Sequence, residues 1–201
     1  MKKRIRTHTN PLNIRQRLTD VDITAGMTQY NRVHLEIGFG KGRFLSQYAE
    51  RHPNDLVIGV EVRKQAVVVF NANHDLPNCV PIWGAGQICL EDVIPNQSLQ
   101  SVFIFHPDPW FKKRHHKRRV INTELIQLIK TKMAPDGVVY ISTDVLELYD
   151  DIMQVLLAED DKLYLANHPF WLTDYQTHWS QFSVIDQRSH FRATFKFKEE
   201  S

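Results

Sequence analysis

Apolar residues along the chain fall into short runs that alternate with amphipathic stretches. The short runs are rich in β-branched and aromatic residues and predict five strands, at Val33–Ile37, Leu56–Glu61, Cys79–Trp83, Ser101–His106 and Val138–Ser142. The amphipathic stretches between and after them predict helices, near Arg43–Arg51, Arg63–Asn73, Thr123–Met133 and Leu146–Ala158. This β-α-β-α order predicts an α/β fold with a doubly wound, mostly parallel sheet.

The two ends of the chain differ from this pattern. Residues 1–20 form a basic leader with no acid before Asp20, and we expect this leader to be flexible. Residues 21–201 are expected to form a single domain, because the chain has no internal repeat or Gly/Ser linker and is long enough for one buried core. Near the end of the chain, Phe191–Phe197 alternates inward and outward residues and predicts an edge strand.

The net charge of +2 conceals an uneven distribution of charge. Twelve of the 25 Lys and Arg residues lie in two short segments, residues 2–17 and 112–119, and the rest of the chain is acidic. Concentrated cationic strips on an acidic body are typical of a protein that binds a polyanion. The alternative is that the two segments are a solvated tail and a solvated loop.

The composition disfavours several other classes of protein. No apolar run reaches the roughly 18 residues of a membrane span, and no N-terminal run resembles a signal peptide, so we expect a soluble, cytoplasmic protein. The two cysteines, Cys79 and Cys89, have no metal-ligand spacing, and the ten histidines include no His-Glu-x-x-His pair. We therefore expect no bound metal.

The first predicted strand runs into a glycine-rich turn, which is the first candidate binding site. The segment Glu36–Gly42 reads Glu-Ile-Gly-Phe-Gly-Lys-Gly, and its alternating glycines allow the backbone to approach a ligand closely. A dinucleotide-binding turn would have its third glycine at position 43, where this chain has Arg43. An acid before the turn suits a cationic amino-acid ligand, and Glu61, at the end of the next strand, is placed to accept from ribose hydroxyls. The alternative is a structural turn with two surface glutamates.

Residues 105–119 are the second and more specific candidate site. Asp108 lies between two prolines and is followed by Trp110, and residues 112–119 are all Lys, Arg or His. A carboxylate can accept from the donor edge of a nucleobase, an aromatic ring can stack on the base, and the basic run can hold the attached phosphates. The alternatives are a turn or helix-cap aspartate, a tryptophan in the core and a solvated loop.

Four segments together resemble the tRNA (guanine-N7)-methyltransferase family, which consists of class I S-adenosylmethionine-dependent methyltransferases with a Rossmann-like sheet. These segments are Glu36–Gly42, Gly59–Glu61, Pro107–Arg119 and Ser142–Asp144. The resemblance covers roughly residues 30–150, and its most specific part is Pro107–Arg119. It implies S-adenosylmethionine as the cofactor and the variable-loop guanine of tRNA as the substrate. We also expect a monomer or homodimer with no metal and no membrane partner.

The resemblance and the chemistry of the residues together define the expected site. Asp108 is the expected catalytic residue. The expected cofactor site comprises Glu36, Gly38, Gly40, Gly42, Glu61, Ala85 and Asp108. The expected tRNA-binding residues are Trp110, Lys112, Arg114, His115, Lys117, Arg118, Arg119, Asp144 and Thr173. Asp144 can equally be the N-cap of the helix predicted near Leu146–Ala158.

Two positions depart from the family pattern. Ala85 stands where the family usually has an acid that reads the adenine amine, and Gln87 is a candidate substitute for that acid. Gln176 stands in the glutamate position of a Thr-x-x-Glu element that begins at Thr173. Either change can weaken binding or alter the choice of substrate. Two alternatives therefore stay open: an amino-directed nucleic-acid methyltransferase, since Asp-Pro-Trp resembles the Asp-Pro-Pro-aromatic motif, and a non-catalytic RNA-binding paralogue.

Overall fold

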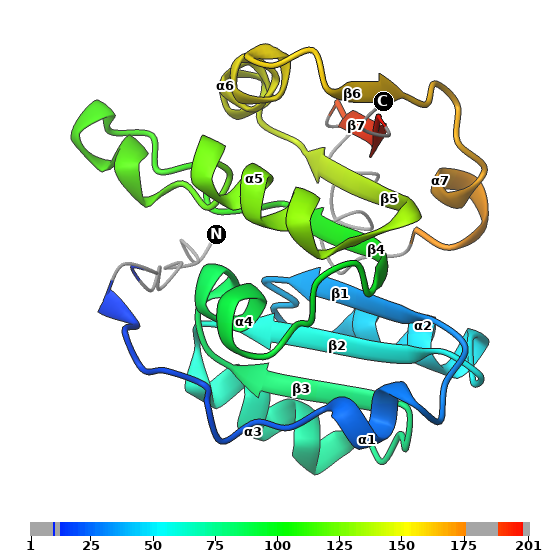
Figure 1. The fold of residues 1–201 in the computed structure, drawn as a ribbon. Coiled ribbons are helices and arrows are strands. Elements are labelled where there is room, and N and C mark those ends of the chain that lie inside the picture. The colour runs from blue at the N-terminus through cyan, green and yellow to red at the C-terminus, as the bar shows by residue number, and fades with distance from the viewer. Residues whose placement is uncertain (1–9, 11–12, 176–188, 199–201) are drawn as a thin grey trace.

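Seven strands form one sheet in the computed structural model, which describes residue 10 and residues 13–175 and 189–198 (Figure 1). The strands are β1 Val33–Ile37, β2 Leu56–Glu61, β3 Cys79–Trp83, β4 Leu99–Phe105, β5 Met133–Thr143, β6 Lys162–Tyr164 and β7 Phe191–Phe197. Their order in the sheet is β3-β2-β1-β4-β5-β7-β6. The first five strands are parallel, and β7 is antiparallel to both of its neighbours, β5 and β6. The prediction of a mostly parallel sheet in one α/β domain is confirmed.

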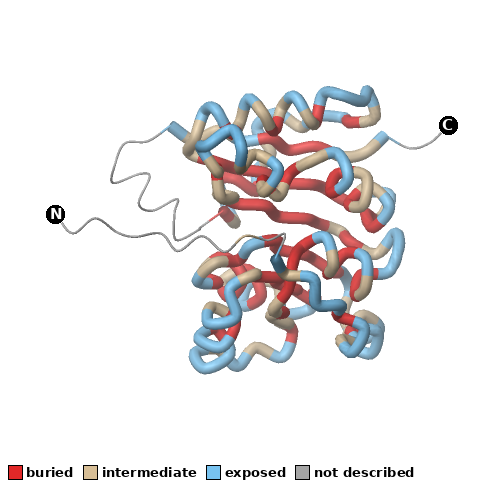
Figure 2. The backbone as a smooth tube through the Cα atoms, turned by 90° about the vertical axis from the view of Figure 1, so that its left-hand side faces the viewer, coloured by how far each residue is buried: buried red, intermediate tan, exposed pale blue. Residues whose placement is uncertain are grey.

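Helices cover both faces of the sheet, as a doubly wound fold requires. They are α1 Thr24–Met27, α2 Arg43–Arg51, α3 Lys64–Asn73, α4 Gly86–Asp92, the 3₁₀ helix η2 Lys113–Arg118, α5 Thr123–Lys132, α6 Leu146–Leu157 and α7 Phe170–Thr173. Helices α4, α5 and α6 share one hydrophobic core with the sheet, and α2, α3 and α7 share the other. Figure 2 shows the buried backbone concentrated in the strands, with exposed backbone in the surrounding helices and loops.

Successive residues of the central strands point into opposite cores. In β4, Val102 and Ile104 belong to the core beneath α4, α5 and α6, whereas Phe103 belongs to the other core. Because helices cover both faces, every residue of β1 and β2 is buried, including the polar His34 and Glu36. The second core is largely aromatic, and the Phe103 ring centroid lies 4.9 Å from that of Phe44 and 5.3 Å from that of Phe170.

Most of the predicted helices and strands are present close to their predicted bounds. The prediction that Phe191–Phe197 is an edge strand is wrong, because β7 lies between β5 and β6. Strand β5 starts at Met133 instead of Val138, because Met133 pairs with Leu99 ahead of an irregularity in the ladder. Strand β4 ends at Phe105, one residue before the predicted end. The elements α1, α4, η2, α7 and β6 were not predicted, and each has seven residues or fewer. Such short segments do not show a periodic pattern of apolar residues.

The end of the basic leader is part of the folded domain. Leu18 is 5% exposed and lies in the core shared with α4, α5 and α6. Its backbone N–H donates to Asp92 at 2.7 Å, and Arg17 pairs with Asp92 and, at 2.9 Å, with Glu91. The flexible leader was expected to extend to residue 20. Residues 17 and 18 instead attach the chain to the end of α4, so the folded part begins earlier than expected. Residues 1–9 and 11–12 lie outside the described part of the chain.

Leu18→Ala is expected to lower the free energy of unfolding by about 2 kcal/mol or more, because it removes buried methyl groups and leaves a cavity. Urea unfolding followed by circular dichroism measures the change. The matched control is Leu172→Ala, whose side chain is 89% exposed, so its effect should stay within about 0.5 kcal/mol. Equal stabilities of the two variants would show that the leader does not contribute to the core.

Candidate active site

The candidate site lies at the carboxyl ends of β1, β2 and β4, which are neighbours in the sheet. The chain passes from β1 outward to β2 and β3 and then returns to the other side of β1 with β4. Ligands of doubly wound sheets bind at such a switch point, outside the carboxyl ends of the strands. The glycine turn, Gly38–Gly42, follows β1, and residues His106–Trp110, called the Asp108 segment from here on, follow β4. The fold therefore brings the two candidate sites to one edge of the sheet.

The glycine turn combines an open side with a packed side. Gly38, Gly40 and Gly42 have φ values of 82°, 62° and 74°, in the left-handed region that favours glycine. A Cβ added at Gly38 would meet no atom within 4 Å, so space for a ligand lies beside it. A Cβ at Gly42 would lie 2.2 Å from the Phe70 ring. Gly42 therefore allows α2 to pack against α3, and its direct contact with the cofactor stays a prediction.

Glu36 is a buried carboxylate beside this turn. The residue is 3% exposed, and its Oε2 atom has no hydrogen-bond partner. Burial raises the pKa of Glu36 to about 8, and the charge of Glu61 contributes to the increase. A buried acceptor without a partner is costly, so Glu36 is suited to a ligand that brings a cation or a hydrogen-bond donor.

Glu61 is also buried, but both of its oxygens are bound. Oε2 accepts from the Gly40 backbone N–H at 2.8 Å and from Arg63 Nη2 at 3.1 Å. Oε1 accepts from the Arg63 backbone N–H and from its Nε, both at 3.0 Å. These hydrogen bonds raise the pKa of Arg63, and the nearby charge of Asp108 adds to the increase. Arg63 was not predicted as a site residue. A cation two residues after Glu61 could have indicated that the two side chains pair.

The Asp108 segment is bounded by two residues in the left-handed region. His106 has a φ of 48° and Trp110 a φ of 42°, which is uncommon for residues other than glycine. Between them, Pro107 and Pro109 restrict the backbone on either side of Asp108. Strained backbone of this kind persists only where the surrounding contacts hold it. The backbone on both sides of Asp108 is thus restricted by the prolines and by the contacts of His106 and Trp110.

Most of the basic run is exposed, as a phosphate-binding strip requires. Lys112, Lys113, Arg114 and Lys117 are exposed, and His115, His116 and Arg118 are partly exposed. Trp110 is partly exposed; the Arg118 guanidinium lies 5.0 Å from its ring centroid, and His115 lies against the ring at 5.9 Å. Partial burial and the charge of Arg118 lower the pKa of His115. Arg118 therefore covers one face of the indole, and a stacked base would use the other face or displace Arg118.

Arg119 differs from the rest of the run. It is 7% exposed, and its Nε donates to the Pro109 carbonyl at 2.8 Å. Its other nitrogens pair with Asp151 and, at 3.3 Å, with Glu147, both on α6. The expectation that Arg119 binds phosphate is therefore replaced by an internal role, in which Arg119 connects the Asp108 segment to α6.

Asp144 does not cap the following helix. The N-cap residue of α6 is Val145, and it makes no side-chain cap hydrogen bond. Asp144 Oδ1 instead lies 3.5 Å from His106 Nδ1, and both side chains are almost fully buried. The N-cap alternative is therefore wrong, and Asp144 lies beneath the Asp108 segment.

The remaining predicted site residues lie in or next to α4 and α7, apart from Gln176. Ala85 is the N-cap residue of α4, is 8% exposed and follows β3 at the same edge of the sheet. The Gln87 side chain is exposed and donates to Glu91 at 3.1 Å. Thr173 is exposed at the end of α7, and its hydroxyl donates to Asp174 at 2.8 Å. Gln176 lies outside the described residues.

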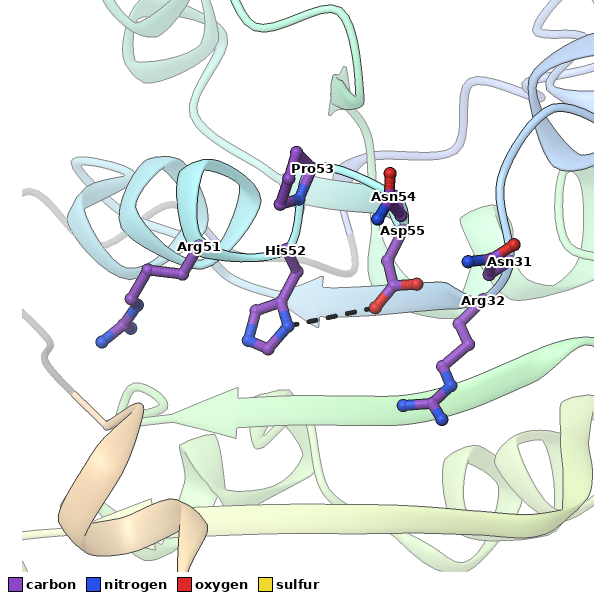
Figure 3. Close-up of a pocket in the computed structure, with 7 residues that line it drawn as sticks. All are labelled: Asn31, Arg32, Arg51, His52, Pro53, Asn54 and Asp55. Carbon is purple, nitrogen blue, oxygen red and sulfur yellow. Dashed lines mark ion pairs between the residues drawn. The ribbon is translucent and has the colours of Figure 1, made fainter.

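A separate polar pocket lies at the opposite edge of the sheet (Figure 3). Its lining consists of Asn31, Arg32, Arg51, His52, Pro53, Asn54 and Asp55, which precede β1 and β2. Arg51 is not free for a ligand there, because its guanidinium donates to the carbonyls of Thr173 and Asp174. Among the described residues there is no group of three metal-ligating side chains, and no helix long and apolar enough to cross a bilayer.

The sheet order and the site at its switch point define a Rossmann-like methyltransferase fold. The chain is similar to the solved 16S rRNA (adenine(1408)-N(1))-methyltransferase from Catenulisporales acidiphilia, with a TM-score of 0.58 over 92% of this chain and 97% of that one. The aminoglycoside resistance methyltransferase NpmB1 gives a TM-score of 0.58 over 90% and 94% of the two chains. Sequence identities of 16% and 19% limit this similarity to the fold.

Sequence comparison gives the family. The putative methyltransferase family matches residues 30–191. The tRNA (guanine-N(7)-)-methyltransferase of Thermosynechococcus vestitus is 34% identical over 77% of this chain and 76% of its own length. The enzyme of the same name from Synechocystis sp. is 36% identical over 85% and 84% of the two chains. The chain belongs to the tRNA (guanine-N7)-methyltransferase family.

Glu36→Gln is expected to remove a pH dependence of stability. The folded-state pKa of Glu36 is about 8, above the ordinary value of 4.5. Folding is therefore favoured most when Glu36 is protonated, and this contribution to the free energy of unfolding is fully present below the unfolded-state pKa. It is lost as the pH rises through the folded-state pKa. From about pH 5 to about pH 8 the wild type should lose a few kcal/mol of unfolding free energy relative to the variant.

Urea unfolding without added ligand, at several pH values across this range, measures the difference. The matched control is Glu50→Gln, a change at an exposed glutamate of α2, which should leave the pH dependence unchanged. Parallel curves for the wild type and Glu36→Gln would mean that Glu36 titrates normally.

Proposed function

We propose that this protein transfers the methyl group of S-adenosylmethionine to N7 of a guanine in tRNA, at the variable loop by family resemblance. The observation that carries the proposal is a juxtaposition at one edge of the sheet. There the open glycine turn, with the unpartnered Oε2 of Glu36, lies at the same edge as the Asp108 segment, which leads directly into exposed cations. Membership of the family supports the same reaction.

The residues at the glycine turn fit this cofactor. S-adenosylmethionine, when bound, supplies a methyl group on a positively charged sulfonium centre. The free oxygen of Glu36 is suited to the amino group of the cofactor, and a cation there would favour the ionised carboxylate that burial disfavours. Glu61 is suited to the ribose hydroxyls, and Arg63 would share or release its oxygens when they bind.

Asp108 has two tasks in the proposed reaction. Guanine N7 carries an in-plane lone pair and no proton, so methylation requires no general base. The protein must hold the base in line with the methyl group, and such positioning can lower the barrier by several kcal/mol. Asp108 can accept from the Watson–Crick N–H donors of guanine and offset the positive charge that develops on the purine. Stacking on Trp110 would contribute about 1–3 kcal/mol more.

The exposed cations of η2 are suited to the tRNA backbone. They follow Asp108 within a few residues, so phosphates held there stay close to the base pocket. Contacts of this kind are independent of sequence and weaken with salt, because they release counterions from the nucleic acid. Target choice therefore rests on the base pocket and on the shape of the tRNA.

Incubation with labelled S-adenosylmethionine and total tRNA, followed by nucleoside mass spectrometry, tests the proposed function. The expected product is N7-methylguanosine. A methylated exocyclic amine would instead support an amino-directed methyltransferase. Intact tRNA binding with no methylated product would support a non-catalytic paralogue.

Asp108→Asn is expected to retain tRNA binding and lose most of the turnover, because capture is spread over many cations while the base is held by one carboxylate. Methyl incorporation and filter binding measure the two properties separately. Asp136→Asn, a change at an exposed aspartate of β5, is the matched control and should leave both properties unchanged. Wild-type turnover in Asp108→Asn would mean that Asp108 is only a turn residue.

Replacing three exposed cations of η2 is expected to weaken tRNA binding and flatten its salt dependence. The triple variant changes Lys113, Arg114 and Lys117 to alanine and leaves the buried Arg119 in place. The slope of log affinity against log salt should fall by about 0.7–0.9 for each phosphate that the variant no longer neutralises. Filter-binding titrations at several salt concentrations measure the slope, and cofactor affinity should not change.

The matched control removes the same number of charges at the opposite edge of the sheet. It changes Arg32, Lys196 and Lys198 to alanine. This control should keep the wild-type slope. An equal loss of affinity in both triple variants would indicate a general effect of net charge and would contradict a phosphate-binding strip at η2.

A further inference from the structure

The backbone turns toward Asp108 at His106. The His106 N–H donates to the Ser142 carbonyl at 2.8 Å, which extends the pairing of β4 with β5 by one residue. His106 then takes a φ of 48°, and the chain enters Pro107 and Asp108. A residue other than glycine is strained in this conformation and keeps it only where the surroundings hold it. The side-chain contacts of His106 therefore bear on where Asp108 points.

Both nitrogens of the His106 imidazole face protein groups. Nε2 lies at hydrogen-bond distance, 2.7 Å, from the Tyr175 hydroxyl, whereas Nδ1 makes no hydrogen bond and lies 3.5 Å from Asp144 Oδ1. The Tyr175 hydroxyl also lies 2.8 Å from Ser142 Oγ. One direction of donation fits these distances: Ser142 donates to Tyr175, Tyr175 donates to Nε2 of a neutral His106, and the ring proton lies on Nδ1, on the side of Asp144.

Tyr175 is held independently of the Asp108 segment. It is 8% exposed, and its ring lies 4.9 Å from Trp171 and 5.0 Å from Phe105, with the Arg192 guanidinium at 5.3 Å. The preceding backbone is fixed by Arg51, which donates to the Thr173 carbonyl at 3.1 Å and the Asp174 carbonyl at 2.8 Å. Figure 3 shows the Arg51 side chain extending from the end of α2 toward α7.

We propose that His106 and Tyr175 are positioning residues for Asp108. The Tyr175 hydroxyl holds the His106 imidazole in one tautomer and one orientation, and the imidazole holds the strained backbone that directs Asp108 toward the base. The catalytic role of the hydrogen bond between Tyr175 and His106 rests on the proposed methyl transfer. The hydrogen bond itself is observed independently of that proposal. Neither residue serves as a proton acceptor in the reaction, because guanine N7 carries no proton to remove.

Tyr175→Phe removes the hydroxyl and keeps the ring. The rate of a single methyl transfer to tRNA is expected to fall about tenfold or more, because small misplacements near the reacting atoms have effects of this size. Affinities for cofactor and tRNA, measured by calorimetry and filter binding, should stay within about twofold of the wild type, since Tyr175 lies outside the expected binding residues. A wild-type rate, or a loss of rate that is matched by lost cofactor affinity, would overturn the proposal.

The matched control is Tyr30→Phe. The Tyr30 hydroxyl also donates one hydrogen bond, to the Pro77 carbonyl at 3.0 Å, away from the candidate site. Its loss should leave the single-turnover rate unchanged. A similar fall in rate in both variants would indicate a general loss of stability and would overturn the proposal.

His106→Asn tests the imidazole contacts separately from the left-handed backbone conformation. Asparagine tolerates the left-handed conformation but is too short to replace the imidazole between Tyr175 and Asp144. The rate should fall as in Tyr175→Phe, and the double variant should be no slower than the slower single variant, because residues that act as a unit are not additive. A wild-type rate in His106→Asn would overturn the proposal, and this variant decides alone if Tyr175→Phe does not fold.

Nitrogen NMR of the histidine rings tests the contact without any activity. In the wild type, His106 should show an unprotonated Nε2 and a protonated Nδ1, and His106→Asn identifies its signals. In Tyr175→Phe this single tautomer should be lost. An unchanged tautomer would overturn the proposal. A wild-type protein that transfers no methyl group would instead contradict the proposed function, and the NMR result would still decide whether Tyr175 holds His106.

Discussion

The parallel pairing of β1 with β2 on one side and β4 on the other is the constraint on which the candidate site depends. In the ladders, Glu36 lies opposite Gly59 of β2 and Phe103 of β4. Parallel strands end at a common edge, so the glycine turn, Glu61 and the Asp108 segment leave the sheet side by side. An antiparallel β2 or β4 would place these groups at opposite edges. The chemistry of the site is thus a result of strand direction as much as of residue type.

The acidic and the basic residues of the candidate site lie at different places, each suited to one of the two expected ligands. The buried acids Glu36 and Glu61 lie at the glycine turn, where a cationic cofactor would bind, and the exposed cations of η2 follow Asp108, where a polyanion would bind. Two cations depart from this division. Arg63 pairs with Glu61, and Arg119 pairs with acids of α6, so each is used to fix a loop of the site.

Local patterns in the sequence predicted most of the strands and the glycine turn, because these depend on neighbouring residues. Runs such as Val33–Ile37 and the alternating glycines are of this kind. The internal role of Arg119 was not predictable, since it is identical in the sequence to the exposed cations beside it and differs only through its pairing with α6. The hydrogen bond between Tyr175 and His106 joins residues 69 positions apart, and no local pattern reports it. Leu18 was missed because the few apolar residues of the basic leader show no helical or strand periodicity.

The position of β7 has a consequence for the synthesis of the protein. Strand β7 lies between β5 and β6, and β6 pairs with no other strand of the described sheet. The first five strands can therefore pair as they leave the ribosome, whereas β6 must wait without a partner until Phe191–Phe197 has been made. At about 5–20 residues per second, this delay lasts a few seconds. During that time the edge of β5 has no partner, which makes it the place where a nascent chain would meet a chaperone or another chain.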